Sequence, residues 1–256
     1  MSMHNLFDLR GKVAMVTGAS RGIGRATAEQ LALLGARVCV SSRNLEACEE
    51  VVQAITARGG EAFACQASIS RPEALQAMVE QTRARWGSID ILVCNAATNP
   101  YYGPMADIED DMFLKIFRNN VLSNLWLARQ VRPDMRACGG GAIVIISSIA
   151  GLKGSATVGA YGVSKAADMQ LARDLAVEWG PERIRVNCVA PGLVETKMAQ
   201  ALIDDPELQA FTNTRLPLRR LGQPHEIAGV VAFLASAAGE FVTGQTIVAD
   251  GGAVIV

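Results

Sequence analysis

Short apolar runs alternate with helical patterns along almost the whole chain, and this alternation limits the possible folds more than any other feature. We predict strands over residues 12–17, 36–42, 61–68, 89–94, 142–146, 184–190 and 246–249. Helical patterns occupy roughly residues 22–34, 45–58, 72–86, 107–137, 159–180 and 224–235. Strands that alternate with helices in this way favour an α/β fold with a parallel sheet covered on both faces.

Length and composition indicate one large domain and exclude several classes of protein. The 256 residues are half apolar, and no linker divides them, so we predict a single domain over residues 1–256. A net charge of −1 gives no reason to expect nucleic acid or a membrane surface as a partner.

The six cysteines are scattered and the two histidines lie far apart, so we expect no metal site. Without a signal pattern or a long apolar run, we expect a cytoplasmic protein. Residues 197–221 are irregular and predict a lid over a substrate site.

A glycine-rich turn joins the first strand to the first helix, with the sequence Thr17-Gly18-Ala19-Ser20-Arg21-Gly22-Ile23-Gly24. Gly18 allows a tight turn, Gly22 allows a ligand to approach the backbone, and Gly24 allows helix and strand to pack closely. The free N–H groups and the positive dipole end of the helix suit the pyrophosphate of a dinucleotide. Taken alone, such a segment is also compatible with a simple turn.

The end of the second strand bears on which dinucleotide is bound. An acidic residue there binds the ribose 2′-hydroxyl of NAD, but this chain has Ser42 and Arg43. The guanidinium groups of Arg43 and Arg21 suit a 2′-phosphate instead, which predicts NADP(H) as the cofactor. The alternative is that both arginines are solvated surface charges.

Ser148 closes the fifth strand, and Tyr161 and Lys165 follow on a helical pattern four residues apart. That spacing places the phenol and the ammonium on one helix face. The pKa of an unperturbed tyrosine is about 10, and a neighbouring cation makes the phenol a stronger acid. With Ser148 holding a carbonyl oxygen, such a phenol could protonate an alkoxide as hydride arrives at carbon. The alternative is that Tyr-x-x-x-Lys marks only an amphipathic face.

Taken together, these motifs make the chain similar to the short-chain dehydrogenase/reductase family along nearly its whole length. The resemblance also includes Asn95-Ala96-Ala97, Asn120, and Pro191-Gly192 with Thr196. It implies a Rossmann-type, doubly wound seven-stranded parallel sheet and a homotetramer. It also implies a small-molecule carbonyl or alcohol substrate.

The resemblance assigns roles to matching positions. Tyr161 would be the general acid/base, Lys165 would support it and bind the nicotinamide ribose, Ser148 would hold the substrate oxygen, and Asn120 would hold a relay water. The positions expected to contact the cofactor are Gly18, Ser20, Arg21, Gly22, Ile23, Gly24, Ser42, Arg43, Ser68, Ile69, Asn95, Ala96, Tyr161, Lys165, Pro191, Gly192, Val194 and Thr196. Among these, Ser68 stands where the family often has an aspartate that contacts adenine. Ala97 stands where the family often has glycine.

The leading hypothesis is an NADPH-dependent oxidoreductase that reduces a ketone or aldehyde reversibly to an alcohol. One alternative is a 3-oxoacyl-thioester reductase of fatty-acid synthesis, with Arg129, Arg132 and Arg136 as a docking surface for its carrier protein. Another is an NAD-dependent sugar or polyol dehydrogenase, which Ser42 and Arg43 disfavour. A dinucleotide-binding redox sensor without catalysis would have no use for the Tyr161 acid.

Overall fold

A parallel sheet forms the centre of the molecule. The computed structural model describes residues 6–197 and 206–256, and within them seven parallel strands pair in the order β3-β2-β1-β4-β5-β6-β7. The strands are β1 (Val13–Thr17), β2 (Arg37–Ser42), β3 (Glu61–Gln66), β4 (Ile91–Cys94), β5 (Gly141–Ile146), β6 (Ile184–Pro191) and β7 (Thr246–Ala249). The predicted seven-stranded, doubly wound α/β fold is therefore confirmed. The strand order reverses between β1 and β4, and ligands of such sheets bind at the carboxyl ends of strands at this point.

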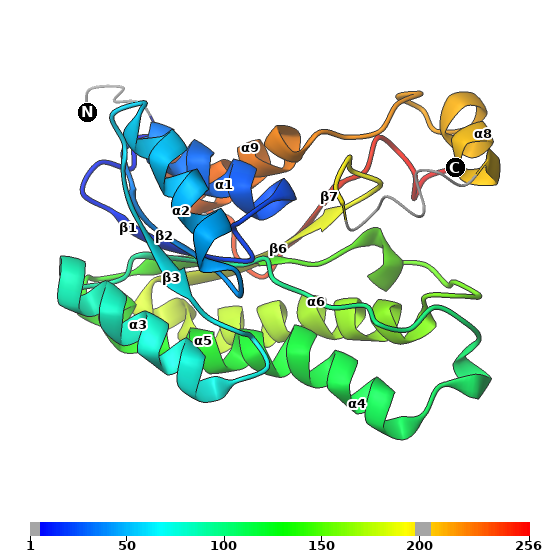
Figure 1. Cartoon of the computed structure of the whole chain (residues 1–256), viewed down its shortest axis with the longest axis horizontal. Helices are drawn as coiled ribbons and strands as arrows, with labels where there is room; N and C mark the ends of the chain where they lie inside the picture. The colour runs from blue at the N-terminus through cyan, green and yellow to red at the C-terminus, as the bar shows by residue number, and fades with distance from the viewer. Residues whose placement is uncertain (1–5, 198–205) are drawn as a thin grey trace.

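Helices cover both faces of the sheet. They are α1 (Gly22–Leu33), α2 (Leu45–Thr56), α3 (Pro72–Trp86), α4 (Asp110–Phe117), α5 (Ser123–Ala137), α6 (Gly159–Trp179), α8 (Pro206–Thr214) and α9 (Pro224–Ala235). In Figure 1, α1, α2 and α9 lie over one face of the sheet, and α3, α5 and α6 lie over the other. In the part of the chain that the structure describes, no helix combines the length and apolarity needed to cross a bilayer.

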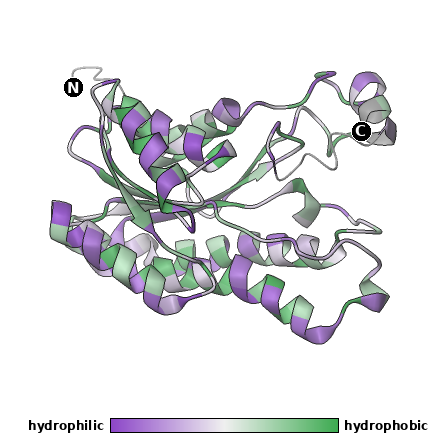
Figure 2. Ribbon diagram, in the orientation of Figure 1, coloured by the Kyte–Doolittle hydropathy of each residue, from purple (hydrophilic) through white to green (hydrophobic). Residues whose placement is uncertain are grey.

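The core has two halves, one on each face of the sheet. Along β1 successive side chains alternate between them: Met15 packs in the half that contains Leu127 and Trp179, whereas Val16 packs in the half that contains Leu31. This alternation follows from the two-residue period of a strand. Figure 2 shows the result, with hydrophobic strands between helices whose polar residues face outward. The central strands β1, β2, β4, β5 and β6 are almost wholly buried, whereas the edge strands β3 and β7 are partly exposed, so the ends of the central strands are rigid supports for a site.

The helix predicted over residues 107–137 is interrupted. Met105–Asp107 form a 3-10 turn, α4 begins at Asp110, and Arg118–Leu122 form a π-helical turn before α5. The two asparagines in this turn, Asn119 and Asn120, are buried. The predicted lid at 197–221 remains a prediction, because residues 198–205 lie outside the described residues. Its described remainder contains α8 and a segment whose Leu216 is buried.

Candidate active site

The glycine turn after β1 has the geometry that its sequence predicts. Gly18 has a φ of +64°, a left-handed conformation that favours glycine. A Cβ on Gly24 would collide with the Gly18 carbonyl oxygen, so only glycine allows α1 to pack so closely on the turn. The Asn95 side chain fastens the arrangement, since its Nδ2 donates to Thr17 O at 2.9 Å and Gly18 O at 3.1 Å. Asn95 therefore lies beside the glycine turn and holds its backbone.

Thr17 joins the ends of β1 and β4. Its hydroxyl oxygen accepts from the backbone N–H groups of Asn95 at 3.0 Å and Ala96 at 3.1 Å. The Thr17 hydroxyl in turn donates to Val93 O at 3.4 Å, and the residue is 3% exposed. This one buried hydroxyl thus fixes the backbone where the sheet order reverses.

A cavity of about 400 Å³ opens at this edge of the sheet. Most of the predicted cofactor contacts line it, and they come from the segments after β1, β2, β3, β4 and β6 and from the start of α1. They are Gly18, Ser20, Arg21, Gly22, Ile23, Gly24, Ser42, Arg43, Ser68, Ile69, Asn95, Ala96 and Thr196. The five other predicted contacts, Tyr161, Lys165, Pro191, Gly192 and Val194, do not line this cavity.

The segment after β2 forms one end of the cavity. Ser42 Oγ donates to Asn44 O at 2.9 Å and accepts from Asn44 N at 3.1 Å. Gln66 Nε2 donates to Arg43 O at 2.9 Å, so the backbone of this segment is held while the Arg43 side chain remains exposed. Arg21 is also exposed and lines the same cavity. The two guanidinium groups give this end of the cavity positive charge.

The end of β6 and the segment after it close the other side. Pro191 and Val194 are buried, and Gly192 N donates to Ala249 O at 3.0 Å. Thr196 reaches the glycine turn, since a Cβ on Gly22 would lie 3.2 Å from Thr196 Cγ2. Pro191, Gly192 and Val194 therefore support the cavity wall, and Thr196 belongs to it.

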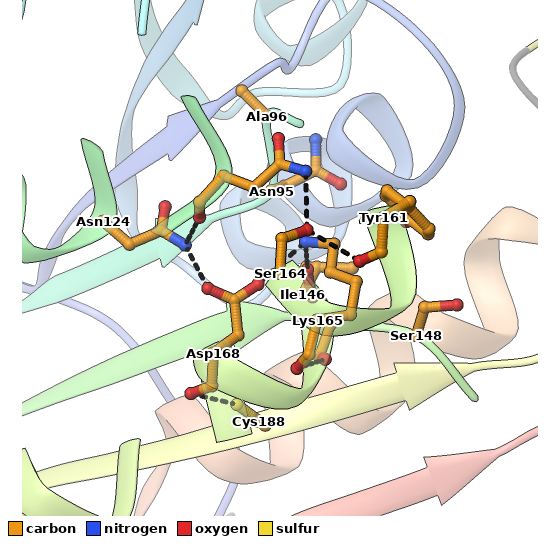
Figure 3. Close-up of polar contacts among 12 residues, drawn as sticks. Asn95, Ala96, Asn124, Ile146, Ser148, Tyr161, Ser164, Lys165, Asp168 and Cys188 are labelled. Carbon is orange, nitrogen blue, oxygen red and sulfur yellow. Dashed lines mark hydrogen bonds and ion pairs between the residues drawn. The ribbon is translucent and has the colours of Figure 1, made fainter. Parts of the chain in front are cut away.

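Ser148 lies just after β5, and Tyr161 lies in the first turn of α6. The 3-10 turn Ile149–Gly151 packs against α6 because position 162 is glycine: a Cβ there would lie 2.7 Å from Ala150 O. Ser148 Oγ accepts from Ala150 N at 3.1 Å, which keeps its own proton available to a ligand. Both Ser148 and Tyr161 are partly exposed, and Figure 3 shows them close to Lys165. The structure thus brings together the three residues that the spacing singled out.

Lys165 lies beneath Tyr161 and is almost completely buried. Its Nζ donates to Ile146 O at 2.9 Å and to Asp168 Oδ2 at 2.9 Å, and it lies 5.7 Å from the centre of the Tyr161 ring. Burial lowers the pKa of Lys165, but the charges of Asp168 and Tyr161 outweigh that effect, and the pKa is raised. The ammonium is therefore charged at neutral pH.

Asn120 anchors the loop after β4. Its Oδ1 accepts from Thr98 N at 2.8 Å, and its Nδ2 donates to Thr98 O at 3.0 Å and to Ser164 Oγ at 3.0 Å. Asn120 thereby joins the loop to α6 through the π-helical turn. Its expected hold on a relay water remains a prediction.

The sequence interpretation missed several residues of this region. Asn119 lines the cavity and donates to Thr98 Oγ1 at 3.3 Å. Asn124 and Asp168 are buried beside Lys165, with Asn124 Nδ2 donating to Asp168 Oδ1 at 3.0 Å. The available signal was spacing: Asn124 follows Asn120 by four residues and Asp168 follows Lys165 by three, so each pair shares a helix face.

Comparisons with known proteins give consistent results. A family profile described as "Enoyl-(Acyl carrier protein) reductase" matches residues 18–254. Dehydrogenase/reductase SDR family member 4 of Oryctolagus cuniculus is 39% identical over 245 residues, 96% of this chain and 94% of that protein.

Two solved structures are similar over nearly the whole chain. A 7α-hydroxysteroid dehydrogenase complexed with NADH and 7-oxo glycochenodeoxycholic acid has a TM-score of 0.93 and 37% identity, covering 98% of both chains. A gluconate 5-dehydrogenase from Burkholderia cenocepacia in complex with NADP and tartrate has a TM-score of 0.92 and 33% identity, also covering 98% of both chains.

Proposed function

The chain belongs to the short-chain dehydrogenase/reductase family, oxidoreductases of carbonyl and alcohol groups, and from this premise we propose that it reduces a ketone or aldehyde with NADPH, using Tyr161 as proton donor. The observation that carries the proposal is the position of Tyr161. Its ring lies 5.7 Å from a buried lysine ammonium and comes from the helix packed against the Ser148 turn. Oxidation of the alcohol would run through the same groups in reverse.

The cavity has the features that a dinucleotide needs. The glycine turn exposes its backbone to the cavity, and a Cβ at Gly22 would crowd the Thr196 side chain that also lines the cavity. Arg21 and Arg43 supply positive charge. Gly18 to Gly24 would hold the pyrophosphate at the start of α1, and Asn95 and Ala96 would support the nicotinamide end. When bound, the dinucleotide supplies the hydride for the carbonyl carbon.

The protein's own groups would manage the oxygen of the substrate. Ser148 would donate its hydroxyl proton in a hydrogen bond to the carbonyl oxygen and hold it near Tyr161. Tyr161 would then give its phenolic proton to that oxygen as negative charge develops on it. The Lys165 ammonium would stabilise the phenolate that remains, because an opposite charge nearby favours the ionised form.

NADPH rather than NADH is the cofactor that the charges favour. The segment Ser42-Arg43-Asn44 carries no acid, and two exposed guanidinium groups line this end of the cavity. The similar structures contain either cofactor, one NADH and the other NADP, so the argument rests on Arg21 and Arg43. Arg43→Ala should weaken NADPH binding about 10- to 100-fold and leave NADH binding nearly unchanged. Dissociation constants from fluorescence titration test this, and tighter binding of NADH by the unaltered chain would refute it.

A second candidate substrate is a 3-oxoacyl thioester on a carrier protein. It is favoured by the description of the family profile and by a surface hollow lined by Arg129, Arg132, Pro133, Arg136 and Ala137. Within this hollow Arg132 is already paired, since its Nη2 lies 2.8 Å from Glu182 Oε1. That pairing leaves less positive charge for a carrier protein and makes this the second choice.

A panel of carbonyl compounds tests the proposal. NADPH oxidation would be followed by absorbance with simple ketones, aryl ketones, α-diketones, keto acids, sugars and an acetoacetyl thioester. We expect ketones or aldehydes to be reduced with NADPH in preference to NADH. Dominance of the thioester would favour the second candidate, and no carbonyl reduced with either cofactor would contradict the proposal.

The chain is further proposed to work as a homotetramer, as its resemblance implied. Support comes from large apolar side chains at the surface, including Val177 on α6 at 82% exposed and Phe241 before β7 at 104% exposed. Contact with another copy would remove such surface from water. Size-exclusion chromatography with light scattering measures the mass directly, and a monomer at micromolar concentration would contradict this proposal.

A further inference from the structure

A continuous line of buried polar groups runs from the catalytic lysine to the π-helical turn (Figure 3). Lys165 Nζ donates to Asp168 Oδ2 at 2.9 Å, and Asn124 Nδ2 donates to Asp168 Oδ1 at 3.0 Å. The same Nδ2 donates to the carbonyl oxygen of Asn120 at 2.6 Å. Direct hydrogen bonds between protein groups therefore connect α6 to α5 and to the π-helical turn.

These groups are inside the protein, where charge is expensive to keep. The side chain of Lys165 is 2% exposed and that of Asp168 is 0% exposed. A buried ion is stable only when it is paired and its remaining hydrogen-bonding capacity is used. Each oxygen of the Asp168 carboxylate accepts an N–H, one from Lys165 and one from Asn124, which is the pattern an ionised carboxylate requires.

The proton transfer proposed above uses the charge of Lys165 but assigns nothing to Asp168. We propose that Asp168, oriented by Asn124, is a positioning residue that keeps Lys165 charged and directed toward Tyr161 at the pH where the enzyme works. This inference rests on the proposed function for its catalytic meaning. The ion pair itself is a property of the chain alone.

Other titratable groups surround the pair, and none of those in residues 6–197 and 206–256 replaces Asp168 as the counter-ion. Burial raises the pKa of the Cys94 thiol on β4 and of the Cys188 thiol on β6, so both stay neutral near pH 7. Cys188 Sγ donates to the backbone oxygen of Asp168 at 3.4 Å. Arg173, on the same helix as Asp168, is exposed. Tyr161 is a further ionisable neighbour of Lys165, with the centre of its ring 5.7 Å from the same Nζ that pairs with Asp168.

Burial also acts on the pair directly. It raises the pKa of Asp168, and the Lys165 ammonium and the Asn124 amide oppose that rise. If the carboxylate is removed, desolvation of Lys165 is no longer balanced, and the lysine loses its proton at lower pH. A neutral Lys165 no longer favours the Tyr161 phenolate. Loss of Asp168 should therefore move formation of that phenolate to higher pH.

An ultraviolet titration of the chain without cofactor or substrate reads this effect. The sequence contains three tyrosines, so subtracting the titration of a Tyr161→Phe variant isolates the phenolate signal of Tyr161. In the same way, the titration of the double variant Asp168→Asn/Tyr161→Phe is subtracted from that of Asp168→Asn. We expect Asp168→Asn to move the Tyr161 transition to higher pH. An unchanged or lowered transition would overturn the proposal.

The matched control is Asp174→Asn, which makes the same chemical change on the exposed face of α6, where Asp174 Oδ1 accepts from Gln170 Nε2 at 2.7 Å. It should leave the transition where it is, and an equal shift would count against a specific role for Asp168. Circular dichroism verifies folding. If Asp168→Asn does not fold, Asp168→Ser takes its place. Serine carries no charge, is smaller than aspartate, and can still donate and accept a hydrogen bond.

A second background separates charge from structure. In Lys165→Met the ammonium is absent, so adding Asp168→Asn should no longer raise the Tyr161 transition. A rise of the same size there would show that Asp168 acts without Lys165 and would refute the proposal. Because these titrations need no substrate, a chain that reduces no carbonyl compound would refute the proposed function while leaving this result interpretable.

Discussion

Replacing Thr17 by valine should loosen the edge of the sheet that forms the cavity. Valine has nearly the shape of threonine, so the change removes the hydroxyl and little else. The backbone N–H groups of Asn95 and Ala96 then lose the acceptor that they share at 3.0 and 3.1 Å. An unsatisfied buried donor costs about 1–3 kcal/mol. Both residues border the cavity, where water can partly replace the acceptor, and we therefore expect a loss of roughly 2–3 kcal/mol in the free energy of unfolding.

Urea denaturation followed by circular dichroism measures this loss, provided that the slope of the unfolding free energy with urea is unchanged. Thr17→Ser is the matched control, because it keeps the hydroxyl and removes only a methyl group. We expect the serine variant to lose less stability than the valine variant, and the KM for NADPH to rise only with valine. Equal stability of Thr17→Val and the unaltered chain would refute the reasoning. A larger loss in Thr17→Ser would do the same.

Two further predictions concern the catalytic turn and a surface ion pair. Gly162→Ala places a Cβ 2.7 Å from Ala150 O and should displace Ser148, lowering kcat about tenfold or more with little change in the dissociation constant of NADPH. Hydrogen bonds from Arg220 and from the backbone hold the pKa of Glu226 at about 2, below its ordinary 4.5. A lowered carboxyl pKa stabilises the fold fully above about pH 4.5, and this contribution is lost as the pH falls through 2. Glu226→Gln should therefore flatten the pH dependence of the urea midpoint in that window, and an unaltered slope would contradict it.

Elements with strong local signals could be predicted closely from the sequence. The helix at 224–235 is correct to the residue, because Pro224 fits the first turn of a helix and cannot lie further inside it. The boundaries of other elements depend on tertiary contacts. The fourth strand begins at Ile91 rather than at 89 because Asp90 turns its side chain to the first strand: Oδ2 accepts from Val13 N and Oδ1 from Lys12 Nζ.

The site was predictable where residue identity and spacing carry the chemistry. Tyr161 and Lys165 share a helix face at any burial, and their spacing alone brings them together. Asp168 was not predictable in the same way. An acid three residues after a lysine usually forms a solvated surface pair, and only the packing of α5 against α6 turns it into a buried counter-ion beside Asn124. Sequence spacing predicts which groups face each other, whereas burial, which decides their electrostatic role, requires the fold.

The measurement that tests the central claim most directly compares the unaltered chain with Tyr161→Phe, using a carbonyl substrate found in the panel. The account predicts that kcat falls by about 10²- to 10⁴-fold, because the proton donor is lost, while the dissociation constant of NADPH stays within about twofold. Retention of most of the activity in Tyr161→Phe would contradict the account. It would show that the proton reaches the substrate oxygen from another group.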